Sequence, residues 1–453
     1  MRFSACLPPE MSLSEPNHRD GRHLPSGARL VTACVFAMAQ NRWLDRNLNT
    51  LPKNDVRAVW RSLACLVFCF ALLVSTKAGA GSFQDCLAGL RGAAIAGGVD
   101  AATFDKTTHG LAPNPDVLAM AEVQPEFKTP IWDYLAGLVD EERVDDGRAM
   151  MARYGQALAL AQSRFGVDEA VITAVWGVES DYGRSFGTRP VVQSLATLTC
   201  AGGRRARYFR SEFIAALKII QHGDIDPAQF NGSWAGAFGH TQFMPSTFLR
   251  VAVDLDGDGR KDLINSVPDA LGSTAAYLRK GGWIPGEEWG YEVRLPEHYT
   301  GPSGRTRKEA MGTWIARGFT RVDGGRLPSG GSAGLLLPAG PSGPAFLVTR
   351  NFDAIYSYNA AESYALAIAL LSDRLRGRHG LVAAWPTNDP GLSRVERREV
   401  QALLMRRGYD LDGKADGVIG TKTRKAISDF QSRSGLSPNG RACASVLAAL
   451  RGK

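Results

Sequence analysis

One apolar segment, residues 168–179 within VDEAVITAVWGVESDYGRS, constrains the fold of this chain more than any other feature. Its apolar residues recur every three to four positions, which predicts a helix with one buried stripe: Ala170, Val171, Ala174, Val175 and Val178. Asp168 is suited to be the N-cap, and Gly183-Arg184 breaks the pattern. The chain is therefore expected to fold around a buried helix whose C-terminal end carries Glu179.

Most of the remaining chain also has helical periodicity, which predicts a mainly α fold. Further helical segments are expected at Ile131–Arg153, Tyr208–Gln221, Val267–Arg279 and Ala360–Arg376. A Gly/Pro/Ser-rich stretch at 321–345 indicates loop and short strand, and Phe346–Tyr358 is expected to be extended.

The chain of 453 residues is long enough for two or three domains. Residues 380–392 (GLVAAWPTNDPGL) have the composition of an interdomain linker. We therefore expect a main domain at 81–379 and a small helical domain at 393–453.

Residues 57–80 have the layout of a secretory signal peptide. Arg57 and Arg61 precede an apolar run from Leu63 to Val74, which is shorter than the roughly 20 residues of a membrane-spanning helix. Ala78-Gly79-Ala80 has the small-x-small pattern of a cleavage site. Cleavage after Ala80 predicts a soluble, periplasmic product, and an uncleaved anchor is the alternative.

Residues 1–56 are rich in Arg and Asn, lack periodicity and place the signal peptide far from the N-terminus. They are interpreted as a non-native or disordered extension, with translation starting near Val56. Three cysteines follow Ala80. In an oxidising compartment Cys86 and Cys200 can pair, whereas Cys443 lies in the separate domain. Whether that disulfide forms stays open.

The positive charge is concentrated at the C-terminus. Residues 393–453 carry 13 Lys/Arg against 6 Asp/Glu, whereas 81–392 carry 30 against 34. A basic domain attracts a polyanion, and nucleic acid and the anionic cell wall both qualify. No nucleic-acid motif accompanies the charge, so the cell wall is the expected partner and nucleic acid is not.

Glu179 is the candidate for acid/base chemistry. At the end of a buried helix its carboxyl is expected to be partly desolvated, with apolar neighbours among Val175, Trp176, Tyr182 and Phe186. Desolvation disfavours the anion and raises the pKa, as a general acid at neutral pH requires. A solvated Glu at a helix end is the alternative.

A second motif, WAGAFGHTQFMPST at 234–247, combines small residues with Gln242 and Phe243. Small residues let a ligand approach the backbone, an amide can bond sugar hydroxyl and acetamido groups, and an aromatic ring can pack on a sugar. A tightly packed turn has the same composition, so this motif alone does not decide.

Together these segments resemble the lytic transglycosylases of the membrane-bound lytic transglycosylase B type, relatives of goose-type lysozyme in fold. The resemblance covers about 86–376 and includes FDKTTHGL, PIWDYLAGLV, AVWGVESDYG, ATLTCAGGRRARYFRSEF, GSWAGAFGHTQFMPS, DLDGDGRKDLINSVPDALGSTAAYL and YNAAESYALAIALLSDRL in order. Seven segments at compatible spacings are a specific signal, although any one of them is weak.

The resemblance implies a role for individual residues. Glu179 matches the single catalytic acid/base, Gln242 a contact of the muramoyl sugar, and Arg204 and Arg205 a basic pair near the peptide-bearing side of the substrate. Positions that line the glycan groove match Tyr134, Tyr277, Tyr358, Asn359 and Tyr364. The chain departs from the pattern at Gly177, where some relatives carry Ser, and at His240.

The sequence near Glu179 supplies one candidate carboxylate, because Asp181 two residues later points to another face of a helix. Two-carboxylate hydrolysis is therefore disfavoured. The resemblance implies instead that Glu179 protonates the bond between N-acetylmuramic acid and N-acetylglucosamine, and that the sugar's 6-hydroxyl closes onto C1 to give a 1,6-anhydro product. A hydrolytic muramidase and a non-catalytic wall-binding scaffold are the alternatives.

The loop DLDGDGRKDLIN has the start of a calcium-binding pattern. Asp254, Asp256 and Asp258 occupy positions one, three and five, and the Arg260 carbonyl position seven. Asn265 stands where the closing Glu is expected, and the resemblance implies Asp269 as its substitute. A structural Ca²⁺ and a plain Asp/Gly turn both remain open, and catalysis needs no cofactor.

The C-terminal segment is similar to the peptidoglycan-binding domain found on many wall hydrolases. Asp416-Gly417-Val418-Ile419-Gly420, Thr421, Thr423 and AISDFQ carry that resemblance. It implies a three-helix domain that tethers a monomeric enzyme to peptidoglycan glycan strands and raises the local substrate concentration. A small helical stability domain is the alternative.

Overall fold

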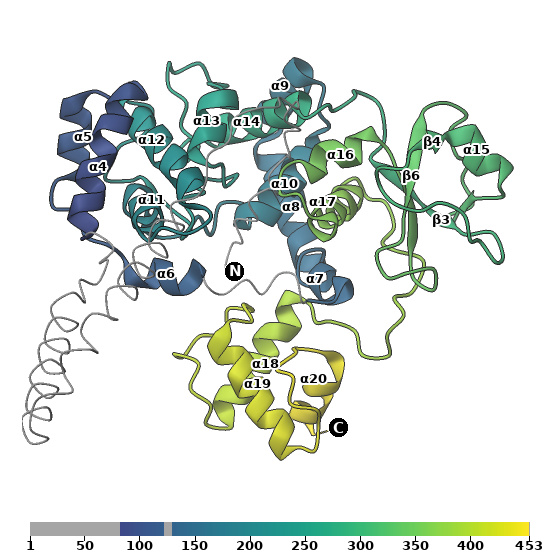
Figure 1. Ribbon diagram of the computed structural model, residues 1–453. Helices are drawn as coiled ribbons and strands as arrows, with labels where there is room; N and C mark the ends of the chain where they lie inside the picture. The colour runs from purple at the N-terminus through teal and green to yellow at the C-terminus, as the bar shows by residue number, and fades with distance from the viewer. Residues whose placement is uncertain (1–81, 122–128, 453) are drawn as a thin grey trace, which may run out of the picture. The chain divides into compact units, whose positions relative to one another are not determined.

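The computed structural model describes residues 82–121 and 129–452 (Figure 1). The expected extension and signal peptide, 1–80, lie outside the described residues. The described residues from 83 onward belong to one compact unit. Within the described residues, no helix combines the length and apolar character that a membrane crossing needs.

The predicted central helix is present as α10, Glu169–Ser180, and its N-cap is Asp168 as expected. The Asp168 carboxylate accepts hydrogen bonds from the backbone N–H of Ala170 at 2.9 Å and of Val171 at 3.4 Å. All residues from 170 to 180 are buried except Glu179, which keeps partial exposure. The helix is surrounded by α8 (Glu141–Arg153), α9 (Gly155–Phe165), α14 (Val267–Lys280) and α17 (Glu362–Leu375) (Figure 1).

A second helical group packs around its own core, to the left of the central helix in Figure 1. It contains α4 (Phe83–Ala96), α5 (Ala101–Thr108), α6 (Pro115–Ala121), α11 (Val191–Cys200), α12 (Ala206–His222) and α13 (Pro245–Val251). Two short strands, β1 (Arg189–Pro190) and β2 (Asn231–Gly232), pair beside it. A disulfide between Cys86 and Cys200 joins α4 to α11, so the pairing that the sequence left open does form.

A small antiparallel sheet, which the sequence did not predict as a unit, occupies residues 290–348. Its strands are β3 (Gly290–Arg294), β4 (Glu309–Ala310), β5 (Thr320–Arg321), β6 (Ser332–Leu336) and β7 (Ala345–Val348), in the order β4-β6-β7-β3-β5. Helix α15 (Met311–Ala316) packs beside it, and Trp314, Phe319 and Leu347 belong to its separate core.

Two segment predictions need correction. Phe346–Tyr358 is extended only through β7, because the Thr349 side chain accepts from the backbone N–H of Asn351 and starts helix α16, Arg350–Tyr356. Ile131–Arg153 is not one helix: α7, Ile131–Ala136, ends before α8 begins. Asp140 caps α8 by accepting from the Arg143 N–H at 2.8 Å, and an N-cap residue is non-helical.

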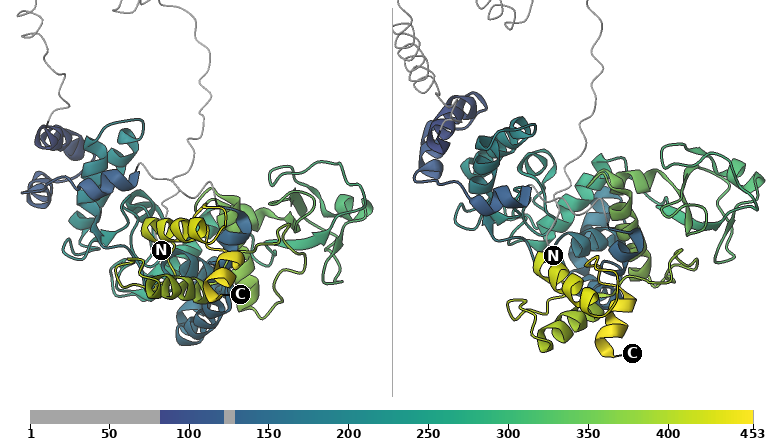
Figure 2. Two further views of the ribbon diagram at one scale, coloured as in Figure 1. Left: turned by 90° about the horizontal axis from the view of Figure 1, so that it is seen from below. Right: turned by 60° about the horizontal axis from the view of Figure 1, so that its bottom comes forward.

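The C-terminal domain has the three predicted helices: α18 (Arg394–Arg406), α19 (Thr421–Arg433) and α20 (Ala444–Arg451) (Figure 2). Ser393 and Glu396 form a capping box at the start of α18. Buried Gln401 accepts from the Gly417 N–H at 2.7 Å and donates to Asp416 at 3.0 Å. These bonds hold the acidic turn that contains Asp410, Asp412 and Asp416.

Removing the disulfide tests its contribution to the fold. We expect Cys86→Ser to lower the free energy of unfolding by about 2–4 kcal/mol, because the bond closes a loop of 114 residues and restricts the unfolded chain. Urea unfolding with and without reductant measures it. Reductant should destabilise the wild type and leave Cys86→Ser unchanged. Equal stability of the variant and the oxidised wild type would contradict the assignment.

Candidate active site

Glu179 lies in the last turn of α10, and its carboxyl meets the side chain of a distant helix. The hydroxyl of Tyr364, in α17, donates a hydrogen bond to Glu179 Oε1. Burial penalises the carboxylate anion and raises the pKa of Glu179 to about 8, while the Tyr364 hydrogen bond opposes that rise. The carboxyl is therefore largely protonated at neutral pH. The sequence predicted the desolvation but not the partner, which lies 185 positions away.

Aromatic rings form a layer from Tyr364 toward residues 234–244, the segment before α13, which we call the Gln242 loop. The rings of Tyr364 and Tyr358 are stacked, with centroids 6.3 Å apart, and Tyr358 and Tyr277 are 4.7 Å apart. Phe243 packs against both Tyr277 and Tyr358 at 5.7 and 5.8 Å. We call Tyr277, Tyr358 and Tyr364 the tyrosine cluster. Phe243 is only 2% exposed, so it lies beneath this cluster as a support.

Hydrogen bonds to the backbone fix two members of the tyrosine cluster. The Tyr277 hydroxyl donates to the carbonyl of Ser357 at 2.7 Å, and the Tyr358 hydroxyl donates to the carbonyl of Thr241 at 2.8 Å. These bonds join α14, the segment after α16 and the Gln242 loop. The cluster is therefore held by three separate parts of the chain.

Gln242 sits in a strained turn that presents its side chain inward. Its φ is +50°, in the left-handed region, and its Nε2 donates to the carbonyls of Gly239 at 2.9 Å and Phe186 at 3.1 Å. Its Oε1 is buried and has no hydrogen-bond partner among the described residues. Buried polar atoms are normally paired, so this oxygen is an available acceptor.

The Gln242 loop is attached directly to the end of the Glu179 helix. Ser180 Oγ donates to the carbonyl of His240 at 2.5 Å and accepts from the Gly183 N–H at 3.0 Å. Trp176 Nε1 donates to His240 Nδ1 at 3.0 Å. Burial lowers the pKa of His240 to about 4, so the imidazole is neutral at pH 7. His240, whose effect the sequence did not reveal, is a packing partner of α10.

Asp181, the carboxylate nearest to Glu179 in the sequence, forms ion pairs with two arginines. Its Oδ1 lies 3.2 Å from Arg143 Nη1 and 2.7 Å from Arg394 Nη1. Arg143 is fully buried and also donates to the carbonyl of Gly177. Sequence reasoning missed both arginines, because neither stands in a motif. Because Asp181 is held in these ion pairs, it is not available as the second carboxylate that hydrolysis would need.

Gly177, where the resemblance led us to expect Ser in some relatives, lies directly against the ring of Tyr182. A Cβ there would lie 2.6 Å from the ring of Tyr182, whose hydroxyl donates to the Arg143 carbonyl at 2.8 Å. A side chain at position 177 would displace that ring. The departure from the family pattern is therefore matched by the packing of Tyr182.

The other predicted substrate-contacting residues are less closely joined to Glu179. Tyr134, in α7, is half-buried against the central core, and Asn359 is half-buried beside Tyr358. Arg204 is exposed and Arg205 half-buried in the turn before α12. The contacts that build the tyrosine cluster do not include these two arginines.

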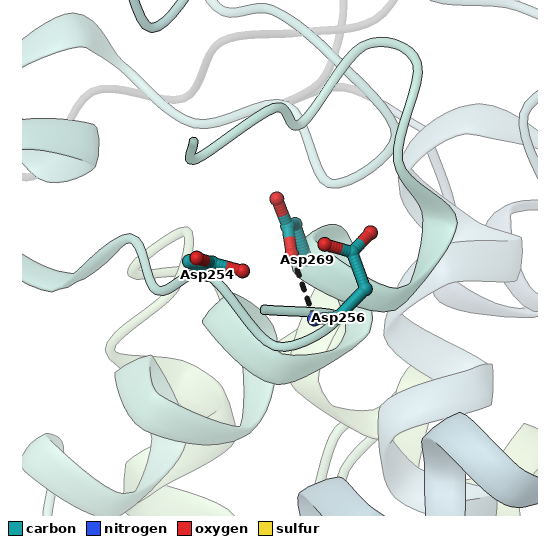
Figure 3. Close-up of side chains that lie close together, drawn as sticks. All are labelled: Asp254, Asp256 and Asp269. Carbon is teal, nitrogen blue, oxygen red and sulfur yellow. Dashed lines mark hydrogen bonds between the residues drawn. The ribbon is translucent and has the colours of Figure 1, made fainter. Parts of the chain in front are cut away.

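The acidic loop brings together three of its predicted metal ligands. Carboxylate oxygens of Asp254, Asp256 and Asp269 all lie within 4.8 Å of one another (Figure 3). Asp269, from α14, accepts backbone N–H groups of Leu255, Asp256 and Asp262, so it fixes the loop. Figure 3 marks its bond to the Asp256 N–H.

The remaining predicted ligands are not in that group. Asp258 accepts the backbone N–H of Arg260 at 2.8 Å, and the Arg260 guanidinium donates to the carbonyl of Asp224. Asp256, Asp258 and Asp262 line a surface hollow of about 360 Å³. Hard oxygen donors suit Ca²⁺, so the residue set fits that ion chemically.

Comparison with known proteins places both domains in families. The family described as "Transglycosylase SLT domain" matches residues 82–373, and "Putative peptidoglycan binding domain" matches 393–450. Membrane-bound lytic murein transglycosylase B of Escherichia coli K12 is 34% identical over 237 residues, which are 52% of this chain and 64% of that relative. The match thus spans less than two thirds of that relative's length.

Two solved structures are similar over most of their length. SltB3 of Pseudomonas aeruginosa, in complex with NAG-anhNAM-pentapeptide, is 45% identical with a TM-score of 0.66, covering 82% of this chain and all of that one. Escherichia coli Slt35, in complex with calcium, is 28% identical with a TM-score of 0.57, covering 66% of this chain and 94% of that one. The mainly α, lysozyme-like fold predicted from the sequence is confirmed.

The raised pKa of Glu179 predicts a pH-dependent stability difference between the wild type and Glu179→Gln. The pKa of Glu179 in the folded state is about 8, against an ordinary value of 4.5. Proton binding to the folded state therefore stabilises the wild type fully below pH 4.5, and this stabilisation is lost as the pH rises toward 8. We expect Glu179→Gln to gain roughly 2–5 kcal/mol over the wild type between pH 4.5 and 8. Urea unfolding at both pH values checks this. A difference independent of pH would mean an ordinary pKa.

Proposed function

Because this chain belongs to the transglycosylase SLT domain family, we propose that it is a lytic transglycosylase that cleaves peptidoglycan, with Glu179 as acid and base. It cuts the β-1,4 bond between N-acetylmuramic acid and N-acetylglucosamine and leaves 1,6-anhydro ends, as part of cell-wall turnover. The observation that carries the proposal is the buried Glu179 carboxyl, which accepts a hydrogen bond from Tyr364 of the tyrosine cluster. Burial raises the pKa of this carboxyl to about 8.

The environment of Glu179 suits both proton transfers. The protonated carboxyl first gives its proton to the glycosidic oxygen as the C1–O4 bond breaks. The sugar's acetamido group stabilises the oxocarbenium character at C1. The Tyr364 hydroxyl donates to the resulting carboxylate, which then takes the proton of the 6-hydroxyl as O6 bonds to C1. The net change moves one proton from O6 to O4 and consumes no water.

The surroundings supply groups that recognise a sugar. Gln242 Oε1, which has no hydrogen-bond partner among residues 82–121 and 129–452, accepts an N–H or O–H of the muramoyl sugar. Tyr134, Asn359 and the tyrosine cluster line the glycan groove. Arg204 and Arg205 attract the carboxylates of the stem peptide. Phe243 supports the cluster from below and does not itself contact the sugar.

The C-terminal domain holds the enzyme on its substrate. It matches a peptidoglycan binding domain, and SltB3 was crystallised with a peptidoglycan fragment. Attachment to the polymer raises the local concentration of cleavable bonds. With the signal peptide removed after Ala80, this monomeric enzyme works in the periplasm on glycan strands.

A structural calcium ion belongs to the same proposal. Asp254, Asp256 and Asp269 provide converging carboxylates, and Slt35 was crystallised with calcium. Asp258 and the Arg260 carbonyl are further oxygen donors of the same loop. When bound, the ion neutralises the acidic residues and stabilises the loop that precedes α14, the helix that carries Tyr277.

Replacing the acid/base tests the catalytic assignment. We expect Glu179→Gln to lower lytic activity on purified sacculi by at least about a hundredfold, since an amide cannot give or reclaim the proton. Glu169→Gln, at the other end of α10, is the matched control and should keep activity.

Mass spectrometry of the digest decides the reaction type. Anhydro ends are one water lighter than reducing ends, so reducing ends alone would identify a muramidase. An active Glu179→Gln would remove the catalytic assignment, and an inactive wild type that still binds sacculi would favour a scaffold.

Calcium binding is tested by thermal unfolding. At one hundred times its dissociation constant, Ca²⁺ should stabilise the wild type by about 2.7 kcal/mol, and Asp254→Asn/Asp256→Asn should lose this gain. Asp412→Asn, in the acidic turn of the C-terminal domain, is the control and should respond like the wild type. No rise in Tm with Ca²⁺ would favour a plain Asp/Gly turn.

A further inference from the structure

The C-terminal domain contacts the catalytic domain through arginines that meet carboxylates. On the C-terminal side, the arginine face consists of Arg394, Arg397, Arg398 and Arg441. On the catalytic side, the acidic face consists of Asp133, Asp140, Glu142, Asp146 and Asp181. Ion pairs and hydrogen bonds join the two faces. Part of the basic charge that the sequence assigned to the cell wall is therefore used inside the protein.

Arg394, the first residue of α18, makes the most contacts in this interface. Its side chain is 8% exposed. Its Nε lies 3.3 Å from Asp140, its Nη1 2.7 Å from Asp181, and its Nη2 3.4 Å from Asp146. Its backbone N–H also donates to Asp140 at 3.1 Å. A planar guanidinium is suited to such simultaneous contacts, and a lysine is not.

Other contacts hold the domain in the same place. Arg441 pairs with Asp133, which is 6% exposed, and Arg397 donates to the Asp133 carbonyl at 2.7 Å. The Arg397 guanidinium also lies over Gly137, where a Cβ would come within 2.2 Å of it. Burying a charge is costly unless an opposite charge pairs with it. The arginine face and the acidic face therefore each compensate the buried charges of the other.

Asp181 links this interface to the active site. It is the C-cap of α10, with φ +53°, and its backbone N–H bonds the Gly177 carbonyl at 3.1 Å. Its carboxylate joins Arg394 of the C-terminal domain to buried Arg143, which in turn donates to the Gly177 carbonyl. Glu179 lies between these two anchored residues, Gly177 and Asp181.

We propose that Arg394 of the C-terminal domain is a positioning residue for Glu179, acting through Asp181. The inference rests on the proposed catalytic role of Glu179. Docking of the C-terminal domain completes the end of the catalytic helix, so this domain contributes to turnover as well as to wall attachment.

The expected effect follows from electrostatics. Without Arg394, Asp140, Asp146 and Asp181 lose a shared cation and repel one another. The turn after α10 then loosens and admits water beside Glu179. Hydration favours the carboxylate and lowers its pKa, so the enzyme loses its protonated acid at a lower pH. A displaced acid also slows the chemical step without removing groups that bind the sugar.

We expect the alkaline limb of the pH profile of kcat to report the titration of Glu179. Within the described part of the chain, the ionisable groups that interact with it are Tyr364 from α17, Tyr358 after α16 and Tyr277 from α14. Burial raises the pKa of each of these phenols, so they stay neutral near pH 8.

The experiment measures kcat and KM of the full chain on purified glycan strands from pH 5 to 9. We expect Arg394→Met to lower kcat by about 10- to 100-fold, to leave KM and sacculus binding nearly unchanged, and to move the alkaline limb of kcat down by about one pH unit. Arg398→Met is the matched control, because Arg398 pairs with Glu142 in the same interface without contacting Asp181.

The inference is overturned if Arg394→Met has the same kcat and the same alkaline limb as Arg398→Met. If Arg394→Met does not unfold cooperatively, Arg394→Gln decides by the same readouts, with a partial loss expected and wild-type behaviour overturning the inference. A wild type that releases no anhydro product overturns the proposed function and this inference together. An active wild type with an unaffected Arg394→Met overturns this inference alone.

Discussion

The hydrogen bond between Tyr364 and the buried Glu179 carboxyl is the interaction on which the architecture of the site depends. An ionisable group at the end of an apolar helix is costly unless it is neutral or paired. Here burial keeps it neutral at pH 7, and the phenol stabilises the anion once the proton leaves. Helix α10 supplies the acid, α17 its partner, and α14 and the Gln242 loop the remaining aromatic layer.

Ion pairs that do not contact the Glu179 carboxyl hold the end of helix α10 in place. Arg143, Arg394 and Asp181 form an ion-pair group directly behind the end of α10. Asp140 also pairs with Arg394, so the two arginines face two carboxylates and the charge is balanced while the backbone beside Glu179 is held. Ser180 and His240 attach the Gln242 loop to the same helix end. The loop of Gln242 is thereby fixed to the helix that carries Glu179.

Much of this arrangement could be predicted from the sequence, because its signals are local. Periodicity and the Asp168 cap identified α10, and composition identified the loop-rich region and the basic C-terminal domain. The sheet at 290–348 and the role of Arg394 could not be predicted, since each depends on contacts between distant residues. The break between α7 and α8 is local, at the Asp140 N-cap, but helical periodicity alone did not reveal it. Phe243 shows the same limit: its type suits a sugar, but packing places it under the tyrosines.

The central claim is that the Glu179 carboxyl remains protonated at neutral pH. A ¹³C NMR titration of glutamate carboxyls, with Glu179→Gln used to identify the resonance, measures this directly. The account predicts one carboxyl with a midpoint near pH 8, absent from the variant. A Glu179 resonance that titrates near the ordinary value of 4.5 would contradict it, because the residue would then be an anion unable to protonate a glycosidic oxygen.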